Sequence, residues 1–198
     1  EHIAADIKWI RDRVKGKPFG IDLVLPASVP EEKSLEELYA MIPRAQREYT
    51  DMIKAKYSVP EPKEKLEISN WGGLDHRRAL DQLEVLFDEK VPVIASGLGS
   101  PEFMLKRAHQ LGIMVWGLVG KPRQARRQIA AGTDVIIAQG YDAAGHTGNI
   151  GTFSIVPQVV DAVGGRLPVL GAGGIADGRG VAAAFMLCAE GAWVGTAF

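Results

Sequence analysis

The segment 139–148 combines the residue types that a catalytic loop requires. It contains Gln139, three glycines and His146, and it directly follows a short apolar run. The small residues allow the backbone to lie close against a flat ligand. An imidazole titrates near neutral pH, so His146 could transfer a proton or polarise an oxyanion. A lone loop histidine is more often structural, but a position at the carboxyl end of a barrel strand favours catalysis, and we predict a catalytic role for His146.

Two further glycine-bearing segments could bind an anion. In 170–179, an apolar run leads into a Gly-Gly pair, and a helix is predicted to begin near Asp177, a residue type favoured at the N-cap. In 193–198, Gly195 and Thr196 follow the next apolar run. Either segment alone could be a tight turn that needs glycine for geometry. Two such strand ends, about 22 residues apart, together predict a phosphate site built from backbone and helix N-terminal amides.

The rest of the sequence alternates between short apolar runs and segments of helical periodicity. The strands are predicted at 19–25, 91–96, 113–118, 135–139, 167–172 and 191–195, and the helices at 1–15, 75–88, 101–111, 121–131, 154–163 and 177–188. Continuous apolar runs are typical of a parallel sheet that is buried on both faces. Their alternation with helices predicts repeated βαβ units.

Two α/β architectures share this pattern. A doubly wound sheet carries its glycine-rich phosphate loop after the first strand. Here the glycine-rich strand ends come last, as in a (β/α)8 TIM barrel, so we predict that barrel. Only six strands are visible, which makes the barrel incomplete: the first two strand–helix units and the closing helix are expected to be missing. The strands at 19–25 and 191–195 would then lack outer partners.

Residues 27–70 differ from the rest in being charged and punctuated by proline. A helix is predicted from Ser34 to Lys56, and we interpret the region as a helical insertion or lid. Its residues form no pattern that indicates a catalytic or binding function. Residues 1–198 are accordingly predicted to form a single barrel domain that carries this insertion.

Composition limits the classes of partner. A net charge of −1 argues against nucleic acid or a membrane surface as partners. The basic residues Lys121, Arg123, Arg126 and Arg127 lie at helical spacing, and we interpret them as a solvated helix face. The absence of a signal peptide or long apolar stretch leads us to expect a cytoplasmic enzyme, and a homo-oligomer is a further expectation.

The single cysteine, Cys188, excludes an internal disulfide and a multi-cysteine metal site, and no metal site is predicted. Cys188 lies in an apolar helical segment, where a small buried thiol is expected.

Three motifs together resemble the nitronate monooxygenase family, formerly called 2-nitropropane dioxygenases. They are Gln-Gly-Tyr-Asp-Ala-Ala-Gly-His-Thr-Gly at 139–148, Gly-Ala-Gly-Gly-Ile-Ala-Asp-Gly-Arg-Gly at 171–180 and Trp-Val-Gly-Thr-Ala-Phe at 193–198. The resemblance extends from Lys17 to Phe198, apart from the lid region. It implies an FMN-dependent TIM barrel with His146 as the active-site histidine.

The resemblance also implies roles for other residues. The FMN phosphate would be bound at Gly173, Gly174, Gly195 and Thr196, with Trp193 and Val194 lining that strand end, and Gln139 and Gly145 would contact the flavin ring or ribityl chain. Three departures stand out. Asp142 and Ala144 replace a common glutamate and glycine. Asp22 occupies a flavin-contacting position where many members carry asparagine; an ionised carboxylate cannot donate a hydrogen bond and would oppose negative charge on a reduced flavin. The contacts from the family's first strand fall outside this chain.

The implied reaction is the oxidation of alkyl nitronates by O2 to carbonyl compounds and nitrite. His146 would bind the nitro oxygens of a small nitronate or nitroalkane substrate, or abstract its α-proton. One alternative is an NAD(P)H-dependent flavin oxidoreductase that acts on quinones or enoyl thioesters. Another is a barrel resembling IMP dehydrogenase, which requires a loop cysteine, whereas Cys188 lies in a predicted helix. A flavin-free binding module is the third.

Overall fold

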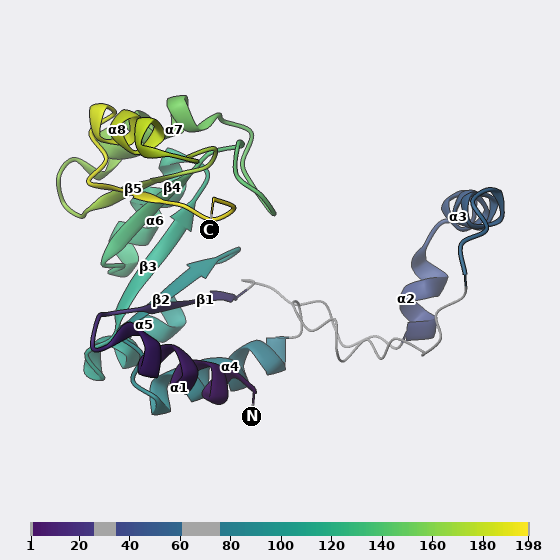
Figure 1. The fold of residues 1–198 in the computed structure, drawn as a ribbon, viewed down its shortest axis with the longest axis horizontal. Coiled ribbons are helices and arrows are strands. Elements are labelled where there is room, and N and C mark those ends of the chain that lie inside the picture. Colours follow the sequence, from purple (N-terminus) through teal and green to yellow (C-terminus); the bar gives the residue numbers. More distant parts are fainter. Residues whose placement is uncertain (1, 26–34, 61–75, 198) are drawn as a thin grey trace. The chain divides into compact units, whose positions relative to one another are not determined.

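The computed structural model describes residues 2–25, 35–60 and 76–197, which fall into two compact units (Figure 1). The first unit comprises Glu1–Ala27 and His76–Phe198, and the second comprises Ser28–Asp75. The helices are α1 (His2–Val14), α2 (Leu35–Met41), α3 (Arg44–Lys56), α4 (His76–Asp88), α5 (Glu102–Gln110), α6 (Pro122–Ala131), α7 (Thr152–Val163) and α8 (Gly178–Met186). The strands are β1 (Gly20–Val24), β2 (Val93–Gly97), β3 (Met114–Val119), β4 (Val135–Gln139), β5 (Val169–Ala172) and β6 (Gly191–Trp193).

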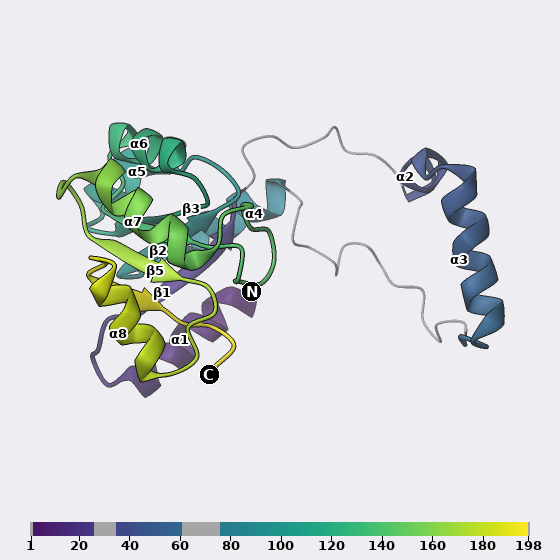
Figure 2. The ribbon, with the colours of Figure 1, turned by 90° about the horizontal axis from the view of Figure 1, so that it is seen from above.

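The first unit contains a parallel sheet with strand order β1-β2-β3-β4-β5-β6. Helices α1 and α4 lie over the β1 end of the sheet, and α7 and α8 lie over the β6 end (Figure 1). From above, α5, α6 and α7 lie next to one another on one side of the strands (Figure 2). The predicted α/β fold, an incomplete TIM barrel of six sequential parallel strands, is confirmed.

The core lies between the sheet and its helices. Alternate strand residues point to this layer, and Ile94, Val115 and Ile136 from three successive strands are fully buried in it. Two clusters make up the core, one around β1, β2, α4 and α5 and the other around β4, β5, α7 and α8. Burying continuous apolar runs in this way requires helices along the outer face of every strand.

The opposite face of the sheet is strongly curled. Trp116 of β3 and Trp193 of β6 meet edge to face there, with ring centroids 6.2 Å apart. In a flat sheet, residues three strands apart would be separated by about 14 Å, because neighbouring strands lie about 4.8 Å apart. The contact therefore follows from curvature, which turns the carboxyl ends of β1 and β6 towards a common centre.

Two local expectations are wrong. The helix predicted from Ser34 to Lys56 is interrupted between α2 and α3, because Pro43 lacks an N–H donor and disfavours helical geometry at Ile42. The prediction of a buried thiol is also wrong. Helix α8 ends at Met186, and Cys188 is exposed in the following turn with φ of 64°. Residues 27–34 and 61–70 of the predicted lid lie outside the described residues, and the lid remains a prediction.

Within the described ranges, no helix combines the length and apolar character needed to cross a membrane.

The tryptophan contact provides a test of the curvature. In a double-mutant cycle, Trp116→Leu and Trp193→Leu should show a coupling of about 0.5–1.5 kcal/mol in the free energy of unfolding. Urea denaturation of the four proteins measures it. Pairing Trp116→Leu with Trp9→Leu, on the exposed face of α1, is the control and should show no coupling. Additive effects of Trp116 and Trp193 would mean that the rings do not touch and that the sheet is flatter.

Candidate active site

Two adjoining cavities open at the carboxyl ends of the strands in the first unit. The first cavity has a volume of about 860 Å³ and the second about 520 Å³. Asp22, Leu118, Gln139 and Ala144 line both. Barrel enzymes place their chemistry at this end of the strands. All of the sequence-predicted site residues except Val194 therefore line one or both of these cavities.

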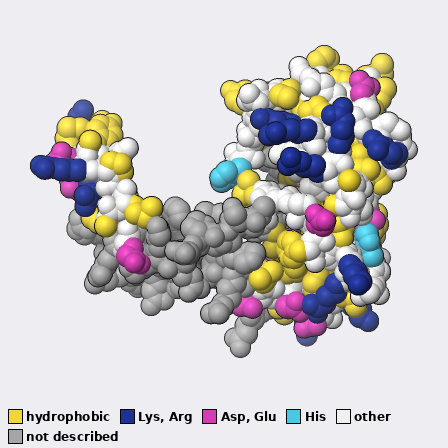
Figure 3. Space-filling model, turned by 180° about the vertical axis from the view of Figure 1, so that it is seen from behind, with side chains coloured by type: hydrophobic (Ala, Val, Ile, Leu, Met, Phe, Trp, Pro, Cys, Tyr) yellow, Lys and Arg dark blue, Asp and Glu magenta, His cyan; other side chains and the backbone are white. Residues whose placement is uncertain are grey.

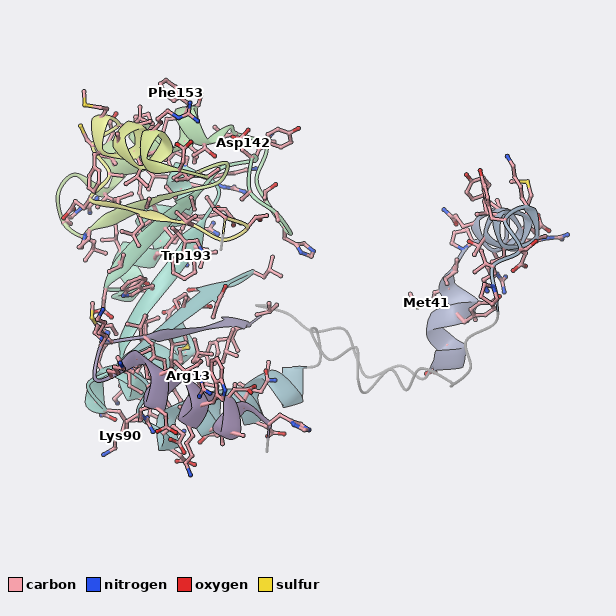
Figure 4. The ribbon with its side chains drawn as sticks, in the orientation of Figure 1. Arg13, Met41, Lys90, Asp142, Phe153 and Trp193 are labelled. Carbon is pink, nitrogen blue, oxygen red and sulfur yellow. The ribbon has the colours of Figure 1, made fainter. Side chains whose placement is uncertain are left out.

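The second cavity brings the two glycine-bearing strand ends together. Ala172 of β5 pairs with Trp193 of β6, so the segments that follow leave the sheet side by side. Gly173, Gly174, Trp193, Gly195 and Thr196 all line this cavity. Trp193 lies on the side of the sheet that faces away from α7 and α8 (Figure 4). Among the described residues, no acceptor takes a hydrogen bond from the backbone N–H of Gly174, Gly195 or Thr196, which leaves three donors available to an anion.

The glycines in these segments serve different purposes. Gly173 has φ of +111°, and a Cβ atom there would lie 2.5 Å from the Thr152 hydroxyl oxygen, so both conformation and space exclude a side chain. Gly174 also has a left-handed φ, of +67°. Gly195 has no such restriction, and nothing lies within 4 Å of the position that its Cβ would take. At Gly195, glycine leaves open space beside the cavity.

The sequence predicted that the N-terminal amides of α8 would take part in this site, but the N-terminus of α8 does not line the cavity. Asp177 is the N-cap residue, as predicted, and its carboxylate accepts a hydrogen bond of 2.9 Å from the Arg179 N–H. The same carboxylate pairs with the Arg179 guanidinium at 2.6 Å, which lowers the pKa of Asp177. A carboxylate from the chain itself therefore occupies the helix end, and neither Gly178 nor Arg179 lines the cavity. The available donors belong to the loops instead.

The loop after β4 is anchored at both ends. The Gly140 N–H donates to the Ala172 carbonyl oxygen, which joins the loop to β5 at 2.9 Å. The Asp142 carboxylate accepts a hydrogen bond of 2.7 Å from the Thr152 N–H at the start of α7, and this bond lowers the pKa of Asp142. Asp142 lies at the base of the loop (Figure 4). These contacts fix the loop where it leaves and rejoins the fold.

The tip of this loop presents His146 to the first cavity. Gly145 precedes it with φ of +76°, and His146 is exposed and lines the cavity with Gln139 and Asp22. A Cβ at Gly148 would lie 2.7 Å from the Gly120 carbonyl oxygen, so the backbone of the loop packs directly against the backbone that follows β3. His146 makes no hydrogen bond or ion pair within the described part of the chain, and its ring nitrogens are available to a ligand.

Asp22 of β1 lies between the two cavities and lines both. Its carboxyl keeps access to solvent through the cavity mouth, but the surrounding protein removes much of its water, and this desolvation raises the pKa of Asp22. In its protonated form, unlike the carboxylate, this carboxyl could donate a hydrogen bond as an asparagine does.

Two cations of the predicted solvated face also border the first cavity. Lys121, which is half-buried, and Arg127, which is exposed, both line it. Lys121 is the N-cap residue of α6 and directly follows the β3 end. Position at the carboxyl edge of the sheet, rather than helical spacing, is the signal that could have identified Lys121.

The pKa of Asp22 predicts a pH dependence of stability. Because the folded pKa lies above the ordinary value of 3.8, the folded protein keeps this proton to higher pH than the unfolded chain does. The free energy of unfolding should therefore fall as pH rises through the window from 3.8 to the folded pKa, and it should stay lower above that window.

An asparagine at position 22 cannot ionise, so Asp22→Asn should not lose free energy of unfolding in this pH window. The variant should therefore gain stability relative to the parent protein as pH rises. Urea denaturation across a pH series measures the difference. A difference between variant and parent that is independent of pH would contradict the assignment.

Comparisons with known proteins agree with this fold. A protein-family model described as nitronate monooxygenase matches residues 1–198. A Mycobacterium tuberculosis protein named as a monooxygenase is 39% identical over 203 residues, covering 99% of this chain and 54% of its own length. The chain therefore spans about half of that relative.

Two solved structures are similar in fold. A nitroalkane oxidase from Streptomyces ansochromogenes has a TM-score of 0.72 at 30% identity, over 98% of this chain and 54% of its own. FabK from Thermotoga maritima has a TM-score of 0.68 at 29% identity, over 98% of this chain and 46% of its own.

Proposed function

The chain belongs to the nitronate monooxygenase family, and we propose that it forms the catalytic part of an FMN-dependent oxidoreductase that uses O2 to oxidise alkyl nitronates to carbonyl compounds and nitrite. One observation carries the proposal. The backbone N–H groups of Gly174, Gly195 and Thr196 and the side chain of His146 make no hydrogen bond within the described residues. They line adjoining cavities that share Asp22 and Gln139.

The residues of the second cavity fit FMN. A phosphate needs several N–H donors and a close approach to the backbone, and Gly174, Gly195 and Thr196 offer free donors beside the open space at Gly195. Trp193 and Leu118 provide apolar walls for a planar ring, and the Gln139 amide can hydrogen-bond its edge. FMN would supply the redox chemistry, while the chain binds, orients and manages protons.

His146 is the proposed catalytic residue. Its neutral imidazole would accept the α-proton of a neutral nitroalkane, and its protonated form would hold the oxygens of a nitronate. A glycine-supported loop tip suits this role, because the loop is anchored through Gly140 and Asp142 and still leaves both ring nitrogens free. Asp22, which lines both cavities, would donate a hydrogen bond to the bound flavin when it is protonated.

A second candidate is an NAD(P)H-dependent flavin oxidoreductase. A Mycobacterium tuberculosis relative named as a carboxyl-CoA dehydrogenase, 38% identical over 125 residues, favours it. Anaerobic mixing separates the two candidates. Bleaching of the flavin absorbance by a nitronate, with no effect of NADH or NADPH, supports nitronate oxidation. The reverse result supports the reductase.

The flavin site predicts an effect of bulk at Gly195. Gly195→Val should weaken FMN binding by about tenfold or more, because the side chain enters the space beside the phosphate donors, and thermal stability should change little. Gly178→Val is the matched control, since Gly178 also has open space and a φ outside the left-handed region but does not line the cavity. FMN titration followed by flavin fluorescence measures both variants. Equal affinity for Gly195→Val and the parent protein would place the phosphate elsewhere.

Replacing His146 tests its catalytic role. His146→Ala should retain FMN but reduce turnover of nitroalkane or nitronate by about 10²–10⁴, the range expected for a positioned acid or base. The control is His2→Ala, at an exposed position of α1 that lies outside both cavities. Steady-state kinetics on both variants provides the measurement. Unchanged kinetics for His146→Ala would make this histidine a structural residue.

A further inference from the structure

The histidine loop, residues 140–151, is bound at both ends to one atom, the carbonyl oxygen of Ala172. The Gly140 N–H, where the loop leaves β4, donates to this oxygen at 2.9 Å. The Thr152 hydroxyl, where the loop enters α7, donates to it at 3.3 Å. Ala172 is the last residue of β5 and directly precedes residues 173–174, the phosphate-donor segment that lines the second cavity. The base of the histidine loop is therefore attached to the strand end from which this segment extends.

The Thr152 side chain contacts the backbone of both segments. A Cβ atom at Gly140 would overlap the Thr152 hydroxyl oxygen, and one at Gly173 would lie 2.5 Å from it. Glycine at these two positions thus lets both backbones approach the hydroxyl directly. Thr152 is half-buried and lines neither cavity. Any influence of Thr152 on the site must therefore pass through the two segments that it joins.

A second contact of Thr152 holds the first part of the histidine loop. The Thr152 N–H donates to the Asp142 carboxylate at 2.7 Å, and a Cβ atom at Gly174 would lie 3.3 Å from the Asp142 Cβ. Asp142 thus contacts both Thr152 and the phosphate-donor segment. It forms no ion pair within the described ranges, although Lys and Arg side chains gather on one face of the first unit (Figure 3). The attachment consequently depends on short-range hydrogen bonds and not on a charge pair that salt would screen.

We propose that Thr152 is a positioning residue for His146, because its hydroxyl, through Ala172, holds the histidine loop against the phosphate-donor segment. The His146 side chain makes no hydrogen bond or ion pair among the residues that the structure describes, so the place of its ring depends on how the loop base is held. A reacting group must stay within about 0.5 Å of its productive position. The inference rests on the proposed function for what His146 does, whereas the attachment of the loop is independent of turnover.

Amide hydrogen exchange of the full protein tests the attachment. The N–H groups of Tyr141 and Ala143 are hydrogen-bonded across the loop base and report its opening. Thr152→Val keeps the shape of the side chain but removes the donor, so these amides should exchange about threefold to tenfold faster, the factor expected for one hydrogen bond. Thr152→Ser keeps the hydroxyl and should stay within about twofold of the parent protein. Thr152→Ala should behave as Thr152→Val does, and it avoids placing a methyl group against the Gly140 backbone.

Turnover provides a second measurement. At saturating FMN, kcat on a nitronate should fall about tenfold or more in Thr152→Val and recover in Thr152→Ser, because only the first variant releases the loop that carries His146. Ser154→Ala is the matched control, since Ser154 lies in the same first turn of α7 and is exposed outside both cavities. Its loop exchange and its kcat should equal those of the parent protein.

Five results would overturn the proposal. They are equal exchange in Thr152→Val and the parent protein, exchange in Thr152→Ser as fast as in Thr152→Val, the same effect in Ser154→Ala, an increase spread evenly over the first unit, or faster loop exchange with unchanged kcat where His146→Ala does reduce kcat. If Thr152→Val does not fold, the same comparisons are decided by Thr152→Ala.

Failure of the proposed function is recognised separately. It would appear as unchanged turnover in His146→Ala, or as no turnover of a nitronate by the parent protein, while loop exchange still depends on the Thr152 hydroxyl.

Discussion

The curvature of the sheet is the constraint on which the candidate site depends. Trp116 and Trp193 come from strands that a flat sheet would hold far apart, and their rings meet on its inner side at 6.2 Å. The same curvature turns the ends of β1, β4 and β6 towards one another. Asp22, from the first strand, and Thr196, which follows the last strand, consequently line a single cavity with Gln139. Loss of curvature would separate these residues without altering any one strand.

The site also depends on which backbone N–H groups already donate a hydrogen bond within the chain. The Arg179 amide at the α8 terminus is bonded to Asp177, and the Thr152 amide at the α7 terminus is bonded to Asp142. The amides of Gly174 and Gly195 have no such partner within the described chain. Carboxylates thus stabilise the two helices, and the donors left for an anion lie in the glycine-bearing loops. Glycine is required at 173 by sterics, whereas at 195 it leaves open space.

Much of this could be predicted from sequence because the signals are local. Continuous apolar runs identified the six strands, and their order along the chain gave their order in the sheet. The glycine-bearing segments and His146 could be identified directly from their positions at strand ends. The cavity position of Arg127 could not be predicted, because helical spacing alone does not distinguish a solvated face from one that borders a cavity. The exposure of Cys188 was missed for a related reason, since the end of α8 removed it from the helix.

The central claim is that the loop amides after β5 and β6 bind the flavin phosphate beside His146. A crystal structure of the protein with FMN bound tests it most directly. The account predicts phosphate oxygens within about 2.7–3.2 Å of the backbone nitrogens of Gly174, Gly195 and Thr196, with the flavin ring against the wall shared by the two cavities. A phosphate bound instead by Lys121 and Arg127 in the first cavity, with the three loop amides left free, would contradict it.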